Sequence, residues 1–182
     1  MSSSKEDIQL PTSNTQLIQR DKQYVWHPFT QAKIAPDPIP LVKAEGIWLY
    51  DESGKKYMDV NSSWWSNLHG HGHPYIADKV NQQFRTLDHT IFAGATHLPA
   101  VELAERLVGH LPDNFQKVFY SDNGSTATEV ALKMSYQYWK NKGIDRRRFL
   151  AVEGAYHGDT FGAMSVGQRG SLNTPFEDLF FD

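Results

Sequence analysis

The chain has 182 residues, of which 40% are hydrophobic and 21% are charged, a composition typical of a globular protein and not of a disordered one. Its 18 Lys and Arg residues against 21 Asp and Glu residues give a net charge of −3, which argues against general electrostatic binding to nucleic acid. The absence of cysteine excludes disulfides, thiolate metal sites and a cysteine nucleophile. No segment approaches the roughly 18 apolar residues that span a bilayer, and the first residues resemble neither a secretory nor a mitochondrial leader, so we expect a cytoplasmic protein with no membrane partner.

The first elements predicted are a tail and a short helix. Residues 1–15 are polar and are predicted to form a mobile tail. A short helix is predicted over residues 17–26. It is expected to end before His27, because Pro28 disfavours helical dihedrals at the residue that precedes it. The alternating prolines at 36, 38 and 40 predict an extended connector after this helix.

A β-hairpin is predicted next. Aromatic and β-branched runs at residues 46–50 and 56–60 flank a glycine-bearing turn, which is the pattern of two antiparallel strands. We place residues 16–65 in an amino-terminal segment that belongs to a small domain.

The second half of the chain alternates predicted strands with predicted helices, which is typical of an α/β fold with a mostly parallel sheet and covering helices. The helices are predicted over residues 74–87, 99–112, 126–143 and 160–166, and the strands over residues 117–120 and 148–152. A sheet with two parallel strands leaves its faces uncovered. We therefore expect residues 66–182 to be the first, incomplete part of a large domain, with the fold truncated unless a partner completes it.

The first candidate site is the turn after the strand predicted at 117–120. Residues 122–126 place a glycine and several hydroxyl groups where the next helix begins, and Thr126 and Glu129 have the spacing of a capping box. Free N–H groups and the helix dipole at such a terminus bind phosphate. The turn is neither a Walker loop nor a Gly-x-Gly-x-x-Gly loop, and an ordinary N-cap is the alternative.

The second candidate site is the glycine-rich loop after the strand predicted at 148–152. In open α/β sheets, ligands bind beyond the carboxyl ends of strands, so this loop and the first are expected to face one crevice. Tyr156 offers a ring face to a planar ligand, with His157 and Asp159 as polar neighbours. The alternative is that Asp159 caps the next helix while Tyr156 packs in the core.

Two further motifs lie between the hairpin and the first candidate site. Trp64 and Trp65 are adjacent, and on a strand they would point in opposite directions, one into the core and one into a pocket. Three alternating histidines follow at positions 69, 71 and 73. They permit a zinc site, but the intervening glycines favour a tight bend with no metal.

Several motifs occur together in one order: WHPFT at residues 26–30, SSWW at 62–65, YSDNGS at 120–125, ALKM and QYW at 131–139, and YHGDTFGAMS at 156–165. In this combination the chain resembles, from about Tyr24 to Gly167, the 7,8-diaminopelargonic acid synthases of biotin biosynthesis. These enzymes are class III, fold-type I aminotransferases that use pyridoxal phosphate (PLP). The resemblance implies amination of 8-amino-7-oxononanoate to 7,8-diaminononanoate by a homodimer.

The resemblance also implies roles for particular residues. Gly124 and Ser125 would bind the phosphate of PLP, Tyr156 would stack on its ring and border the substrate, and Trp64 would line the pocket for the apolar chain of the substrate. Phe29 stands where the best-known members carry a substrate-contacting tyrosine, so the hydroxyl donor is absent. Most members take the amino group from S-adenosylmethionine, which we expect here, whereas some members that resemble this chain at Phe29 use lysine.

The resemblance places the Schiff-base lysine and its aspartate partner beyond Asp182, so no catalytic residue is assigned within this chain and residues 1–182 alone are expected to be inactive. Three alternatives remain at this point. They are another class III omega-aminotransferase, a metal-dependent hydrolase that uses the histidines at 69, 71 and 73 with His157 and Asp159, and a non-enzymatic remnant of the fold.

Overall fold

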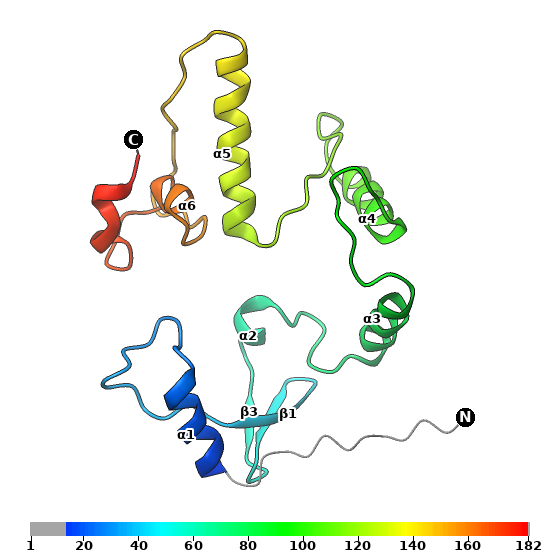
Figure 1. The fold of residues 1–182 in the computed structure, drawn as a ribbon, viewed down its shortest axis with the longest axis vertical. Coiled ribbons are helices and arrows are strands. Elements are labelled where there is room, and N and C mark those ends of the chain that lie inside the picture. The colour runs from blue at the N-terminus through cyan, green and yellow to red at the C-terminus, as the bar shows by residue number, and fades with distance from the viewer. Residues whose placement is uncertain (1–13, 182) are drawn as a thin grey trace. The chain divides into compact units, whose positions relative to one another are not determined.

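The computed structural model describes residues 14–181, and Figure 1 shows the elements in chain order. They are α1 (Asn14–Tyr24), β1 (Leu41–Glu45), β2 (Trp48–Asp51), β3 (Lys56–Met58), α2 (Ser62–Trp65), α3 (Pro74–Thr86), α4 (Leu98–Gly109), α5 (Gly124–Asn141), α6 (Phe161–Ser165) and the 3₁₀-helix η1 (Thr174–Leu179). The predicted helices at 17–26, 74–87, 99–112 and 160–166 are confirmed as α1, α3, α4 and α6.

The chain divides into two compact units, Met1–Ala93 and Gly94–Asp182. The predicted tail at residues 1–15 lies outside the described residues, except that positions 14 and 15 belong to α1. The assignment of residues 16–65 to a small domain and of 66–182 to a large one stays a prediction. None of the helices between residues 14 and 181 combines the length and hydropathy that a membrane span requires.

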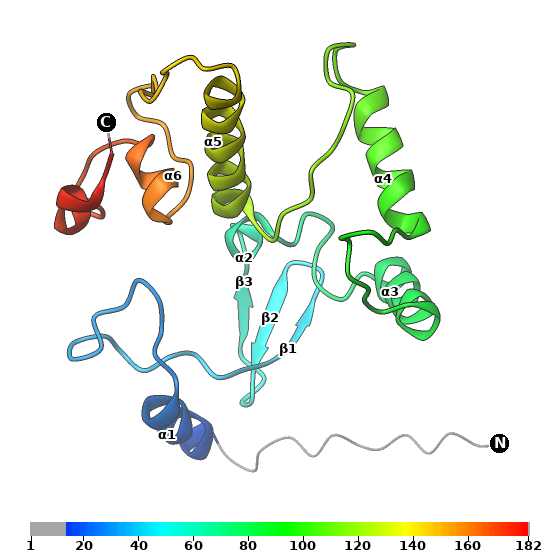
Figure 2. The ribbon, with the colours of Figure 1, turned by 45° about the horizontal axis from the view of Figure 1, so that its top comes forward.

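The first unit contains a three-stranded antiparallel sheet in the order β1-β2-β3 (Figure 2). The predicted hairpin is confirmed as β2 and β3, with Trp48 opposite Met58 and Leu49 opposite Tyr57. The strand β1 is missing from the prediction, which assigned no element to residues 41–45. A proline cannot donate to a strand ladder, and β1 begins at Leu41, directly after the last proline.

The bend that the glycines between residues 69 and 73 predict is confirmed. Gly70 and Gly72 have φ of 78° and 66°, a region that glycine enters without a steric penalty. The bend returns the chain to the β1–β2 turn, where Gly46 and His71 exchange two backbone hydrogen bonds of 3.0 and 2.7 Å. His71 is therefore fixed at its backbone to the end of the sheet.

In the second unit, α5 begins earlier than the sequence indicates. Its N-cap is Asn123, whose side chain accepts from the Thr126 amide at 3.0 Å, while the Asn123 amide donates to the Thr126 hydroxyl at 3.2 Å. The predicted capping box of Thr126 with Glu129 is wrong. Asparagine is among the strongest N-cap residues, and Asn123 starts the helix at Gly124, before Thr126. Gly143, with φ of 69°, follows the helix end as predicted.

The two predicted parallel strands at 117–120 and 148–152 are not formed among the described residues. A strand requires a neighbouring strand to complete its hydrogen-bond ladder, and no strand pairs with either segment between residues 14 and 181. Leu150 and Val152 are consequently exposed. The buried apolar side chains described are Ala163, Met164 and Val166, so the core of the second unit lies in and just after α6, which packs on α5.

Candidate functional site

The N-terminus of α5 presents two backbone donors that the helix does not use. The amides of Thr126 and Ala127 donate to Asn123, but within the part of the chain described no acceptor is found for the amides of Gly124 and Ser125. Behind them stands a helix of 18 residues, whose aligned peptide dipoles amount to about half a positive charge at this end. The geometry fits a phosphate group.

The loop at residues 154–160 packs directly on this helix terminus, as the sequence predicts for two loops that share a site. The Asp159 amide donates to the Ser125 hydroxyl oxygen at 3.2 Å, and the Thr128 hydroxyl donates to the His157 carbonyl at 3.2 Å. Gly158 makes this approach possible. Its φ is +119°, and a Cβ atom there would lie 2.8 Å from the Ser125 Cα.

Tyr156 lies on this loop and is 72% exposed as a residue, so its side chain is available to cover a planar ligand. Its hydroxyl donates to the Asp159 carboxylate at 2.7 Å, and this hydrogen bond raises the pKa of Tyr156 above its ordinary value. The alternatives of a core Tyr156 and a helix-capping Asp159 are both wrong, since the N-cap of α6 is Thr160 and Asp159 binds Tyr156 instead.

Glu129 holds the loop and α6 against α5, a role that the sequence does not reveal. Its Oε1 accepts from the Thr160 hydroxyl at 2.5 Å, from the Gly162 amide at 2.7 Å and from the Ala163 amide at 3.2 Å. A carboxylate is favourable at a helix N-terminus, because the first amides there have no intrahelical partner. A Cβ on Gly162 would lie 2.7 Å from the Glu129 Cδ, so the contact also requires glycine.

In the first unit, Phe29 and Trp64 lie in contact. Their ring centroids are 5.4 Å apart at an interplanar angle of 70°, an edge-to-face arrangement. Both residues are more than half exposed, Phe29 at 67% and Trp64 at 59%. These two residues, which the resemblance assigns to substrate binding, therefore form one exposed aromatic surface.

Trp64 stands on a left-handed turn, not on a strand as expected. All four residues of α2 have positive φ, between 49° and 68°, and Ser63 and Trp64 have ψ of 56° and 51°. Each left-handed residue other than glycine costs roughly 1–2 kcal/mol. Neither Trp64 nor Trp65 is buried, so the expected division into one core and one pocket tryptophan is wrong.

Asp59 fastens this turn. Its carboxylate accepts from the Ser63 amide at 2.9 Å, from the Ser63 hydroxyl at 2.7 Å and from the His71 imidazole at 2.8 Å. These hydrogen bonds, led by that of the Ser63 amide, lower the pKa of Asp59 to about 2. Asp59 is therefore a charged acceptor throughout the physiological pH range.

The histidines at 69, 71 and 73 do not form a metal site. The His71 imidazole is bound to the Asp59 carboxylate. The rings of His69 and His73 face each other instead, with their centroids 6.1 Å apart. Among residues 14–181, no three His, Cys, Asp or Glu side chains lie close enough together to hold a metal ion. The metal-dependent hydrolase is therefore not favoured.

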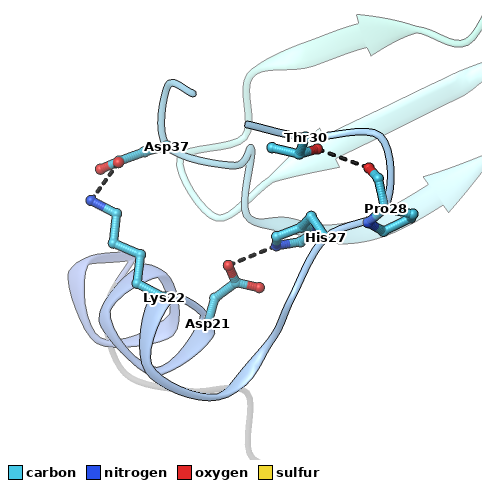
Figure 3. A network of polar contacts seen from close by, with 6 residues as sticks. All are labelled: Asp21, Lys22, His27, Pro28, Thr30 and Asp37. Carbon is cyan, nitrogen blue, oxygen red and sulfur yellow. Dashed lines mark hydrogen bonds and ion pairs between the residues drawn. The ribbon is translucent and has the colours of Figure 1, made fainter. Parts of the chain in front are cut away.

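A cavity of about 420 Å³ lies between α1 and the proline-rich connector in the first unit. At its wall, Lys22 pairs with Asp37 at 2.5 Å, and His27 contacts Asp21 at 2.8 Å (Figure 3). These contacts tie the connector and the Trp-His-Pro motif to α1. None of the residues expected to bind cofactor or substrate lines this cavity.

Comparison with known proteins identifies the family of the chain. A sequence profile described as aminotransferase class-III matches residues 30–180, and the chain belongs to that family. Class III aminotransferases are PLP enzymes of fold type I, which settles the fold class.

Relatives within the family carry a more specific name. The chain is 54% identical over 158 residues to the adenosylmethionine-8-amino-7-oxononanoate aminotransferase of Synechococcus elongatus, covering 87% of this chain and 37% of that protein. It is 43% identical over 173 residues to the enzyme of the same name from Staphylococcus aureus, covering 92% and 38%. The chain thus spans less than two-fifths of the length of these relatives.

Solved structures give the same result. The crystal structure of the Methanocaldococcus jannaschii adenosylmethionine-8-amino-7-oxononanoate aminotransferase superimposes with a TM-score of 0.88 at 39% identity, over 93% of this chain and 40% of that one. The structure of an omega transaminase from Pseudomonas jessenii in complex with PMP superimposes with a TM-score of 0.82 at 30% identity. The match covers 88% of this chain and 36% of that one.

Proposed function

We propose that this chain forms the amino-terminal part of an enzyme that aminates 8-amino-7-oxononanoate to 7,8-diaminononanoate in biotin biosynthesis. The relatives named for this substrate match nearly all of the chain, which supports the proposal. The remaining length of those relatives corresponds to the part that would supply the Schiff-base lysine and its aspartate partner. Residues 1–182 alone are therefore inactive in this proposal.

The observation that carries the cofactor assignment is the pair of unused amides at Gly124 and Ser125. They donate to the phosphate of PLP, and the Ser125 hydroxyl adds a third donor, since its oxygen already accepts from Asp159. Tyr156 covers the pyridine ring with its exposed face. PLP, when bound, supplies the electron sink that amino-group transfer requires.

The residues around Tyr156 keep it in one protonation state. The Asp159 carboxylate accepts a hydrogen bond from the Tyr156 hydroxyl and raises its pKa, so Tyr156 remains a neutral phenol. Glu129 in turn fixes the loop that carries both residues.

Substrate binding falls to the aromatic surface of Phe29 and Trp64, which excludes water from the apolar chain of the substrate. The amino donor is S-adenosylmethionine in this proposal, with lysine as the alternative because Phe29 has no hydroxyl. A homodimer in the cytoplasm is part of the same proposal.

The test is an amination assay on the complete enzyme loaded with PLP. With 8-amino-7-oxononanoate as acceptor, S-adenosylmethionine should give diaminononanoate, and lysine should give little or none. Turnover with lysine alone would select the alternative donor. Turnover of simple ketones and amines with no activity on the amino ketone would favour an omega transaminase like the Pseudomonas jessenii protein and contradict the proposal.

A further inference from the structure

The turn that carries Trp64 stays left-handed only through contacts made outside it. Within the turn, the Trp65 amide donates to the Asn61 carbonyl and the Ser66 amide to the Ser62 carbonyl, both at 2.9 Å. A right-handed turn of the same residues would form equivalent bonds without the steric conflict of positive φ. The left-handed form therefore requires a restraint from the surrounding structure.

Asp59 and His71 provide that restraint. Asp59 holds Ser63 by its amide and its hydroxyl, and both bonds depend on the present direction of the turn. Asp59 itself is fixed by His71, and the side chains of the two residues are only 6% and 14% exposed. The backbone amide of Asp59 also donates to the Ile47 carbonyl at 2.9 Å.

The restraint is anchored on the sheet. His71 is joined to Gly46 by two backbone hydrogen bonds, and Gly46 lies between β1 and β2. A continuous path of hydrogen bonds thus runs from the sheet through His71 and Asp59 to Ser63, the residue before Trp64.

We propose that Asp59 and His71 are positioning residues that set the direction of the Trp64 ring and thereby the affinity of the enzyme for its apolar substrate. This inference rests on the proposed function, since it takes Trp64 as part of the substrate surface. Losing the His71 contact releases Asp59, the turn relaxes toward right-handed dihedrals, and the Trp64 ring leaves Phe29.

The experiment uses His71→Phe in the complete, PLP-loaded enzyme. The substitution keeps a ring and removes the donor to Asp59. We expect KM for the amino ketone to rise by about tenfold, as for loss of a hydrogen bond to a charged group, with kcat changed less than about twofold. His69→Phe is the matched control, because His69 contacts His73 and not Asp59, and its KM should stay near that of the wild type.

A second substitution separates positioning from a general structural role. Glycine adopts positive φ without strain, so Ser62→Gly in the His71→Phe background should restore KM to within about threefold of the wild type. An unchanged KM in His71→Phe would overturn the proposal, and so would a raised KM that Ser62→Gly does not restore.

A crystal structure of the His71→Phe enzyme tests the same idea without activity. We expect negative φ at Ser63 and Trp64, whereas retention of the left-handed turn would contradict the proposal. If the wild-type enzyme fails to aminate the ketone, the proposed function fails, and this structural result still decides the positioning role.

Discussion

The Tyr156 hydroxyl and the Asp159 carboxylate form a pair whose protonation can be measured. The hydrogen bond to Asp159 favours the neutral phenol and raises the pKa of Tyr156. Asp159→Asn removes the negative charge, so Tyr156 should ionise at a lower pH than in the wild type. An alkaline ultraviolet titration measures this, with Tyr156→Phe subtracted to isolate the one tyrosine, and an unchanged titration would show that the pair is not formed.

Gly158 is the residue with the least room for a side chain in the candidate site. A Cβ would lie 2.8 Å from the Ser125 Cα, and the φ of +119° is strained for any other residue. Gly158→Ala should push the loop away from α5 and weaken PLP binding by roughly 5- to 150-fold, since strain of this kind costs roughly 1–3 kcal/mol. PLP titration of the complete enzyme measures the effect.

Gly109→Ala is the control for that substitution, because a Cβ at the end of α4 meets no atom within 4 Å. It should leave PLP affinity unchanged. Equal affinity in the Gly158 and Gly109 variants would contradict the close packing of the loop on Ser125.

At the scale of elements, Glu129 couples α5 to α6. Glu129→Ala leaves the Thr160 hydroxyl and two amides without their acceptor, which should cost about 1–2 kcal/mol. We expect PLP affinity to fall roughly 5- to 30-fold, as Tyr156 loses its fixed position. Glu102→Ala on the exposed face of α4 should have no effect, and an equal loss there would argue against the coupling.

The elements also show which features the sequence predicts and which it does not. Helices α3 and α4 carry apolar residues at helical spacing with a proline in the first turn, and local signals of this kind suffice for them. The segments at 117–120 and 148–152 have strand composition, but a strand exists only with a partner, and composition cannot supply one.

Two features of the site could not be predicted from local sequence patterns, because they depend on contacts between residues far apart in the sequence. The left-handed turn at Ser62–Trp65 depends on Asp59 and on His71, twelve residues away from Asp59, and no propensity favours serine or tryptophan at positive φ. The contact of Glu129 with Thr160 joins residues 31 positions apart. In contrast, the proximity of Ser125 to the Tyr156 loop was predictable, because both segments follow runs of strand composition in an α/β order.

At the scale of the whole molecule, the chain leaves much apolar surface uncovered. Leu150 is fully exposed, Val152 is 75% exposed, and the buried apolar residues described are confined to Ala163, Met164 and Val166. Apolar side chains that are left exposed in this way favour association between molecules. Residues 1–182 expressed alone should therefore aggregate in size-exclusion chromatography and show no lysine-bound PLP absorbance. A monodisperse monomer with a cooperative melt would contradict this prediction.

The most direct test of the account is a crystal structure of the complete enzyme with PLP. We predict that the phosphate accepts hydrogen bonds from the amides of Gly124 and Ser125 and that the Tyr156 ring stacks on the pyridine ring. A phosphate bound elsewhere, or a Tyr156 ring that does not touch the coenzyme, would contradict the assignment of the site.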